Sequence, residues 1–160
     1  MKFSKDITIN APAKKVWDIL GHKFADVGQW SRLVSHSVVN NNAQKVNNSP
    51  VGGRLCETSI GKISEEFTAY DEEGMTFSFK GVITSKVFSN VISTNAVTAI
   101  DENTSKVTVT PNVDLKMIGI LMYPLIKMNL GKLIKQGLID LKYFAENDKP
   151  SPEKLASQKK

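Results

Sequence analysis

Glu65 is the residue in this sequence whose surroundings most favour proton transfer or ligand anchoring, because it lies among apolar neighbours. On an extended strand, Ile63 and Phe67 project from the same face as Glu65. A carboxylate on such a face is costly to bury without a partner. Arg54, which shares a face with Cys56 on the preceding strand, is the candidate partner. Two interpretations follow: a structural ion pair, or a carboxylate that anchors a ligand or acts as an acid and base.

The other residue types that commonly do chemistry do not form a second site. His22 and His36 lack the spacing of a helical metal pair, and Cys56 is the single cysteine, so no metal, cofactor or internal disulfide is predicted. The sequence has no nucleophile elbow, phosphate loop or dinucleotide fingerprint. If the chain is an enzyme, we expect it to position a reactive substrate and to move protons through Glu65.

The length and composition predict one globular domain. The chain has 160 residues, of which 41% are hydrophobic and 23% charged. Its longest uncharged apolar run, Met117 to Ile126, is shorter than the roughly 20 residues that a membrane-spanning helix needs. Residues 1–6 have no apolar leader, and with one cysteine this favours a reducing cytoplasm.

The positive charge of the chain is concentrated near its C-terminus. The net charge is +5, and residues 116–160 hold nine lysines against four acidic residues. Arg32 and Arg54 are the only arginines, which argues against a protein that reads nucleic-acid bases. The lysines are interpreted either as a solvated helix face or as a surface for transient contact with an anionic membrane or an acidic partner.

Hydrophobic periodicity predicts an antiparallel sheet followed by one long helix. Two short helical segments, after Pro12 and over residues 23–29, should follow the first strand, and Asn40 to Pro50 should form a polar loop. The last helix should run from about 118 to 146 with a kink at Pro124. Residues 148–160 read as a disordered lysine-rich tail beyond a domain of residues 1–147. The strands are expected over residues 3–9, 33–40, 54–59, 63–70, 75–80, 87–100 and 107–115.

The long helix carries one apolar stripe that should face the sheet. At 100° per residue, the stripe contains Ile126, Leu130, Leu133, Ile134, Gly137, Leu141 and Phe144. Gly137 lies in the middle of the stripe and admits two interpretations, close packing on a strand or space kept free between helix and sheet. The preceding segment, Ile118 to Tyr123, is apolar on all sides, so it should be buried or contact an apolar partner.

Two motifs resemble a known superfamily over residues 3–146. The segment Ile7-Thr8-Ile9-Asn10-Ala11-Pro12, with Val16-Trp17 and Leu20 after it and a later Trp30, resembles the opening of the START-like, or SRPBCC, superfamily. Val51-Gly52-Gly53-Arg54, with Gly61, Glu65 and Asp71, resembles the polyketide cyclase/dehydrase branch, which shares this pattern with the plant abscisic-acid receptors. The resemblance implies an α+β helix-grip fold. In that fold a curved seven-stranded antiparallel sheet wraps round a long C-terminal helix, with a cavity between them.

The resemblance, together with strand alternation, selects the residues that should face the cavity. It places Ser93 and Asn95 inside as polar anchors, and it places the loop at 40–53 and the turn near Ser85 over the cavity mouth. The gate and latch motifs of the hormone receptors are absent, so a receptor role is not expected. The full set of cavity residues expected is Trp30, Arg54, Cys56, Ile63, Glu65, Phe67, Phe77, Phe79, Val91, Ser93, Asn95, Leu133, Gly137 and Leu141.

Three functions are compatible with these features. The first is binding or transport of a small hydrophobic molecule or lipid in the cavity, without catalysis. The second is a metal-free cyclase or dehydratase that acts on a polyketide-like substrate through Glu65. The third is a peripheral membrane or protein-interaction domain, which rests on the helix lysines and the apolar segment 118–123.

Overall fold

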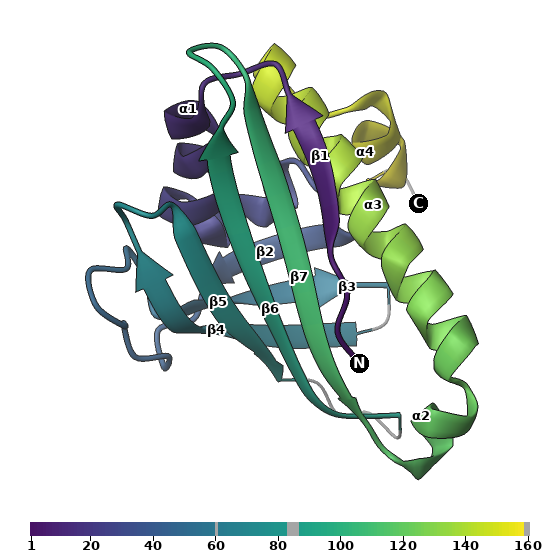
Figure 1. The fold of residues 1–160 in the computed structure, drawn as a ribbon. Coiled ribbons are helices and arrows are strands. Elements are labelled where there is room, and N and C mark those ends of the chain that lie inside the picture. The colour runs from purple at the N-terminus through teal and green to yellow at the C-terminus, as the bar shows by residue number, and fades with distance from the viewer. Residues whose placement is uncertain (60, 83–86, 159–160) are drawn as a thin grey trace.

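The computed structural model describes residues 1–59, 61–82 and 87–158. Within these residues, seven strands form one antiparallel sheet, which curves beside the long helix α3 (Tyr123–Asn147) (Figure 1). The spatial order is β1-β7-β6-β5-β4-β3-β2, so each strand from β2 onward pairs with the next one along the chain. The strands are β1 (Lys5–Ile9), β2 (Val34–Val39), β3 (Gly53–Thr58), β4 (Gly61–Asp71), β5 (Thr76–Val82), β6 (Phe88–Ala99) and β7 (Ser105–Leu115).

This arrangement confirms the predicted fold class. The strands that follow the short helices connect as hairpins, and β1 closes the far edge of the sheet by pairing with β7. Successive side chains of a strand point to opposite faces of the sheet, so every second residue of each strand can face α3. The result is a helix grip, in which the sheet and the C-terminal helix enclose a common interior.

The short helices after β1 supply the aromatic core. α1 (Ala13–Trp17) continues directly into a π-helical turn, η1 (Asp18–His22), and then into a 3₁₀ helix, η2 (Phe24–Gln29). Trp17 and Phe24 are both buried, and the Phe24 ring lies 4.2 Å from the ring of Phe67, centroid to centroid. Gly21 is required beneath Trp17, since a Cβ there would come within 2.8 Å of the indole. These aromatic contacts fix the short helices against the sheet.

A β-bulge changes the alternation predicted for β4. Phe67 pairs with Phe79, but Ala69 pairs with Ser78, so Thr68 is an extra residue on the β4 side. Simple alternation from Glu65 would have placed Ala69 on the inner face. The bulge instead exposes Ala69 and buries Tyr70, which a strictly two-residue period cannot anticipate.

The last helix is broken where a kink was predicted. α2 (Met117–Leu121) ends before Met122, and α3 begins at Tyr123 with Pro124 in its first turn. Proline is tolerated there because the first N–H groups of a helix have no partner within it. None of the helices in the described residues has both the length and the apolar character that crossing a bilayer requires.

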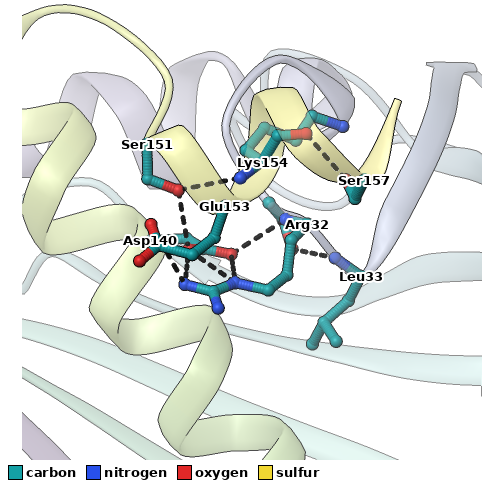
Figure 2. Close-up of polar contacts among 8 residues, drawn as sticks. Arg32, Leu33, Asp140, Ser151, Glu153, Lys154 and Ser157 are labelled. Atoms are coloured by element: carbon teal, nitrogen blue, oxygen red, sulfur yellow. Dashed lines mark hydrogen bonds and ion pairs between the residues drawn. The ribbon is translucent and has the colours of Figure 1, made fainter. Parts of the chain in front are cut away.

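The C-terminal segment differs from the disordered tail predicted for residues 148–160. Pro152–Ser157 form helix α4, which packs beside α3, and the Ser151 side chain caps it by accepting a hydrogen bond from Lys154 N (Figure 2). Lys154 is fully buried, and its Nζ donates to Val34 O at 2.6 Å. Burial lowers the pKa of Lys154. The domain boundary at residue 147 stays a prediction.

Candidate functional site

A cavity of about 360 Å³ lies between the sheet and α3. Its walls come from β3 to β7, from the end of η1 through η2 to the start of β2, and from the middle of α3, between Leu130 and Leu141. Strand alternation explains the sheet side, because residues two apart on β5 and β6 project into the same space. The wall is mainly apolar, and its polar side chains are Ser31, Arg54, Thr58, Ser59, Glu65, Ser93 and Asn95.

The structure brings most of the residues expected at the cavity into one wall. They come from the segment after η2, from strands β3 to β6 and from α3, which are far apart in sequence. The predicted residues that line the cavity are Trp30, Arg54, Ile63, Glu65, Phe77, Phe79, Val91, Ser93, Asn95, Leu133, Gly137 and Leu141. Their role in binding a ligand stays a prediction.

Two of the predicted cavity residues, Cys56 and Phe67, lie in the packed core instead. Phe67 is covered by the ring of Phe24, which itself forms part of the cavity wall. Cys56 is buried, and this burial raises the pKa of its thiol to about 11, although nearby Arg54 opposes the change. A thiol with so high a pKa is a poor nucleophile at neutral pH.

The loop at 40–53 is also placed away from the cavity. No residue of this loop lines the cavity. Val46 and Val51 pack against the core, and Asn47 Nδ2 donates to Tyr70 O at 2.9 Å. The expectation that this loop covers the mouth is therefore wrong, while the expected turn near Ser85 lies outside the described residues.

Several lining residues were not predicted. Val107 and Val109 form the apolar face of β7, and Leu130 and Ile134 belong to the helix stripe, so alternation and helical spacing could have identified them. The segment between η2 and β2 offered no such periodic signal. The lining residues that the prediction omitted are Leu20, Phe24, Val27, Ser31, Leu33, Val34, Thr58, Ser59, Val107, Val109, Pro111, Leu130, Ile134 and Leu138.

Arg54 and Glu65 form an ion pair in the cavity wall. The two residues are register partners on β3 and β4, and Arg54 Nε donates to Glu65 Oε2 at 2.5 Å. Arg54 Nη1 donates to Phe24 O at 2.7 Å, and the guanidinium carbon lies 3.9 Å from the centre of the Phe24 ring. The side chains of Arg54 and Glu65 are 11% and 18% exposed. Glu65 therefore has the partner that its burial requires, and the pair presents charged groups to the cavity.

A second polar cluster lies outside the cavity. His22 Nδ1 is 3.2 Å from Asp18 Oδ1, and His22 Nε2 is 2.9 Å from Glu72 Oε1. The hydrogen bond to Glu72 raises the pKa of His22. Tyr70 also donates to Glu72, at 2.8 Å, so the cluster joins η1 to the end of β4. The polar side chains of this cluster thus have hydrogen-bond partners within the protein. Among the described residues, no group of three or more metal-ligating side chains is close enough to hold an ion.

Comparison with solved structures finds the same fold in proteins of low sequence identity. The ZhuI aromatase/cyclase from a Streptomyces species matches with a TM-score of 0.74 and 10% identity, over 91% of this chain and 93% of that one. A START superfamily protein from Mycobacterium smegmatis matches with a TM-score of 0.66 and 14% identity, over 89% and 98%. The protein XoxI from Bacillus cereus matches with a TM-score of 0.70 and 15% identity, over 91% and 96%.

The sequence itself identifies the family. No curated protein matches the sequence. The model of the family described as polyketide cyclase/dehydrase and lipid transport matches residues 1–146, which include β1 to β7 and nearly all of α3. The match agrees with the START-like fold and with the cavity between sheet and helix. The chain therefore belongs to the polyketide cyclase/dehydrase and lipid transport family.

Proposed function

We propose that this protein binds a small hydrophobic molecule or a lipid inside the cavity between the sheet and α3. The cavity itself carries the proposal, because its volume of about 360 Å³ is too large to arise from ordinary packing defects. Ligand pockets in proteins span about 300–1,000 Å³ and have mainly apolar walls with a few polar groups. This cavity has that composition.

The polar groups suggest what the ligand carries. Arg54 and Glu65 lie on the β3–β4 part of the wall, while Ser93 and Asn95 lie on β6. Hydroxyl, amide and guanidinium groups can donate hydrogen bonds to ligand oxygens, and the surrounding apolar wall accepts rings or hydrocarbon chains. A mainly apolar molecule with one or two oxygen functions fits these walls.

Native mass spectrometry tests the binding proposal directly. We expect the purified protein to carry an excess mass of a few hundred daltons under native conditions, which disappears on denaturation. Extraction and identification of the released molecule would then separate a lipid from a ring-forming polyketide. If native and denatured masses agree, and the protein also takes up no lipid or aromatic compound added in excess, the proposal is wrong.

A catalytic role as a cyclase or dehydratase is the second candidate, and the Arg54–Glu65 pair in the cavity wall favours it. In such a role Glu65 would transfer protons on a substrate that the cavity holds in a folded conformation. Arg54 would stabilise the negative charge that develops on a substrate oxygen.

A Glu65→Gln variant tests this catalytic role. With a poly-β-ketone analogue as substrate, we expect turnover to fall about a hundredfold or more while binding is retained, because the amide keeps the shape but not the basicity. Glu66→Gln is the matched control, since Glu66 follows directly on β4 and does not line the cavity. Unchanged turnover in the Glu65 variant would show that this carboxylate is not the acid or base.

A further inference from the structure

The tip of α2 exposes apolar side chains to an unusual degree. Met117 and Leu121 are 82% and 85% exposed, and Ile120 is 63% exposed. We refer to these three residues as the α2 tip. The tip lies at the end of the molecule opposite α1 (Figure 1). Clusters of exposed apolar side chains on a folded protein commonly mark an interaction surface.

The backbone holds the α2 tip in this exposed position. Lys116 N donates to Val87 O at 2.9 Å, immediately before α2 begins. Gly119 is buried against the same carbonyl, and a Cβ at this position would lie 2.7 Å from Val87 O. The inner side of α2 thus packs on the chain that leads into β6, and the apolar side chains project away from the fold. These backbone contacts fix the position of the α2 tip in the connection between β7 and α3.

The outer face of α3, which follows α2 directly along the chain, is exposed as well. Leu125, Met128, Lys132, Lys135 and Ile139 follow one another at alternating intervals of three and four residues, so they share one side of the helix. All five are exposed. This side is opposite the stripe that lines the cavity. It combines apolar side chains with basic ones, as helices that lie in a membrane interface do.

The charge of this region selects its partner. From Leu115 to Ile139 the sequence has four lysines and no acidic residue. In the part of the chain that the structure describes, neither Lys132 nor Lys135 pairs with a carboxylate. We propose that the α2 tip and the outer face of α3 dock on the surface of an anionic lipid bilayer. The apolar tip enters the headgroup region and the lysines contact the lipid phosphates and carboxylates.

The docking surface adjoins the cavity. Leu133 lines the cavity and is also 44% exposed, on the same turn of α3 as Lys132. A bilayer in contact with the outer face of α3 would therefore lie close to Leu133, where the wall of the cavity reaches the protein surface. If the protein binds a lipid as proposed above, docking would bring the cavity to the source of its ligand. The docking itself does not depend on that proposed function.

Vesicle flotation with the full chain tests the proposal without any knowledge of the cavity ligand. We expect binding to vesicles of phosphatidylcholine with phosphatidylserine, weak binding to phosphatidylcholine alone, and release at high salt. A Lys132→Gln/Lys135→Gln variant should bind about thirtyfold more weakly, because each lysine at an anionic surface contributes about fivefold. A Met117→Ser/Leu121→Ser variant should bind at least about tenfold more weakly, because less apolar area enters the bilayer.

Lys14→Gln/Lys45→Gln is the charge-matched control. Lys14 lies on α1 and Lys45 lies in the loop between β2 and β3, and both are exposed. This variant should bind as the wild type does, and circular dichroism should show that all variants are folded. Equal weakening by the control would overturn the proposal, since net charge alone would then explain the binding. Binding that is indifferent to lipid charge would overturn it too. A concentration-dependent dimer lost in the Met117→Ser/Leu121→Ser variant would instead assign the face to a second copy of the chain.

Discussion

A Gly137→Phe variant is expected to lose most of its ligand binding while it remains folded. Gly137 lines the cavity from the middle of α3, and a Cβ built there contacts only Leu33 Cδ1, at 3.8 Å. A larger side chain can therefore enter the cavity without displacing backbone. Phenylalanine buries about 150–250 Å² and would fill much of the available space. We expect affinity for a hydrophobic ligand to fall at least about tenfold, equal to about 1.4 kcal/mol.

Gly131→Phe is the matched control for this variant. Gly131 also lies on α3, but it does not line the cavity, and a Cβ there would meet the flexible end of Lys5 at 3.6 Å. Both substitutions remove a helical glycine, so both should affect helix propensity in the same direction. Only Gly137→Phe should impair binding.

Titration with a fluorescent apolar probe, anilinonaphthalene sulfonate, measures the difference between the two variants. Binding of the probe to exposed apolar surface, including the α2 tip, is common to both proteins and cancels in the comparison. Native mass spectrometry should show the co-purified ligand with Gly131→Phe and not with Gly137→Phe. Equal binding by the two variants would mean that the ligand does not occupy the cavity beside Gly137.

An Asp140→Ala variant is expected to lower the free energy of unfolding by about 3 kcal/mol. Asp140 on α3 is fully buried and accepts hydrogen bonds from Arg32 Nη2 at 2.6 Å and from Arg32 N at 2.8 Å (Figure 2). Ser151 Oγ donates to the same carboxylate at 3.2 Å. Alanine would leave these donors without their acceptor. Losing one partner of a buried ion pair costs about 3–5 kcal/mol, and the lower value applies because the Arg32 side chain keeps 24% of its surface exposed.

Urea denaturation measures this loss of stability, and an exposed ion pair serves as its control. Lys62 Nζ lies 3.2 Å from Glu57 Oε1, with side chains 86% and 48% exposed. Lys62→Ala should change the free energy of unfolding by less than about 1 kcal/mol, because solvent screens surface pairs. If Asp140→Ala proves as mild as Lys62→Ala, the Arg32–Asp140 pair does not hold the segment between η2 and β2 to α3.

The hairpin pairing of β2 to β7 and part of the cavity wall could be predicted from the sequence because they depend on local periodicity. Strands alternate with a period of two, so a polar residue such as Glu65 and its apolar neighbour Ile63 must share a face. Short turns between consecutive strands require antiparallel pairing, which places Arg54 opposite Glu65 once the strands are located. The stripe on α3 follows from the helical repeat in the same way.

The departures from the prediction arise where local periodicity is interrupted or where distant segments meet. The extra residue at Thr68 reverses the facing of Ala69 and Tyr70, although the sequence there reads as a regular strand. Phe67 leaves the cavity wall because Phe24, from a helix formed more than 40 residues earlier, covers it. Neither effect has a signal in the local sequence.

The amino-acid sequence by itself thus determined the sheet, its antiparallel order and the side of α3 that faces it, since each depends on the spacing of neighbouring residues. Tertiary structure alone decided that α4 folds. The Ser151 cap and Pro152 in the first turn are local signals for a helix, but a helix of six residues is too short for such signals to hold it alone. It is held because Lys154 reaches the carbonyl of Val34, 120 residues away in sequence, and because Ser151 reaches Asp140. The energy of such contacts depends on how the finished fold brings the two segments together.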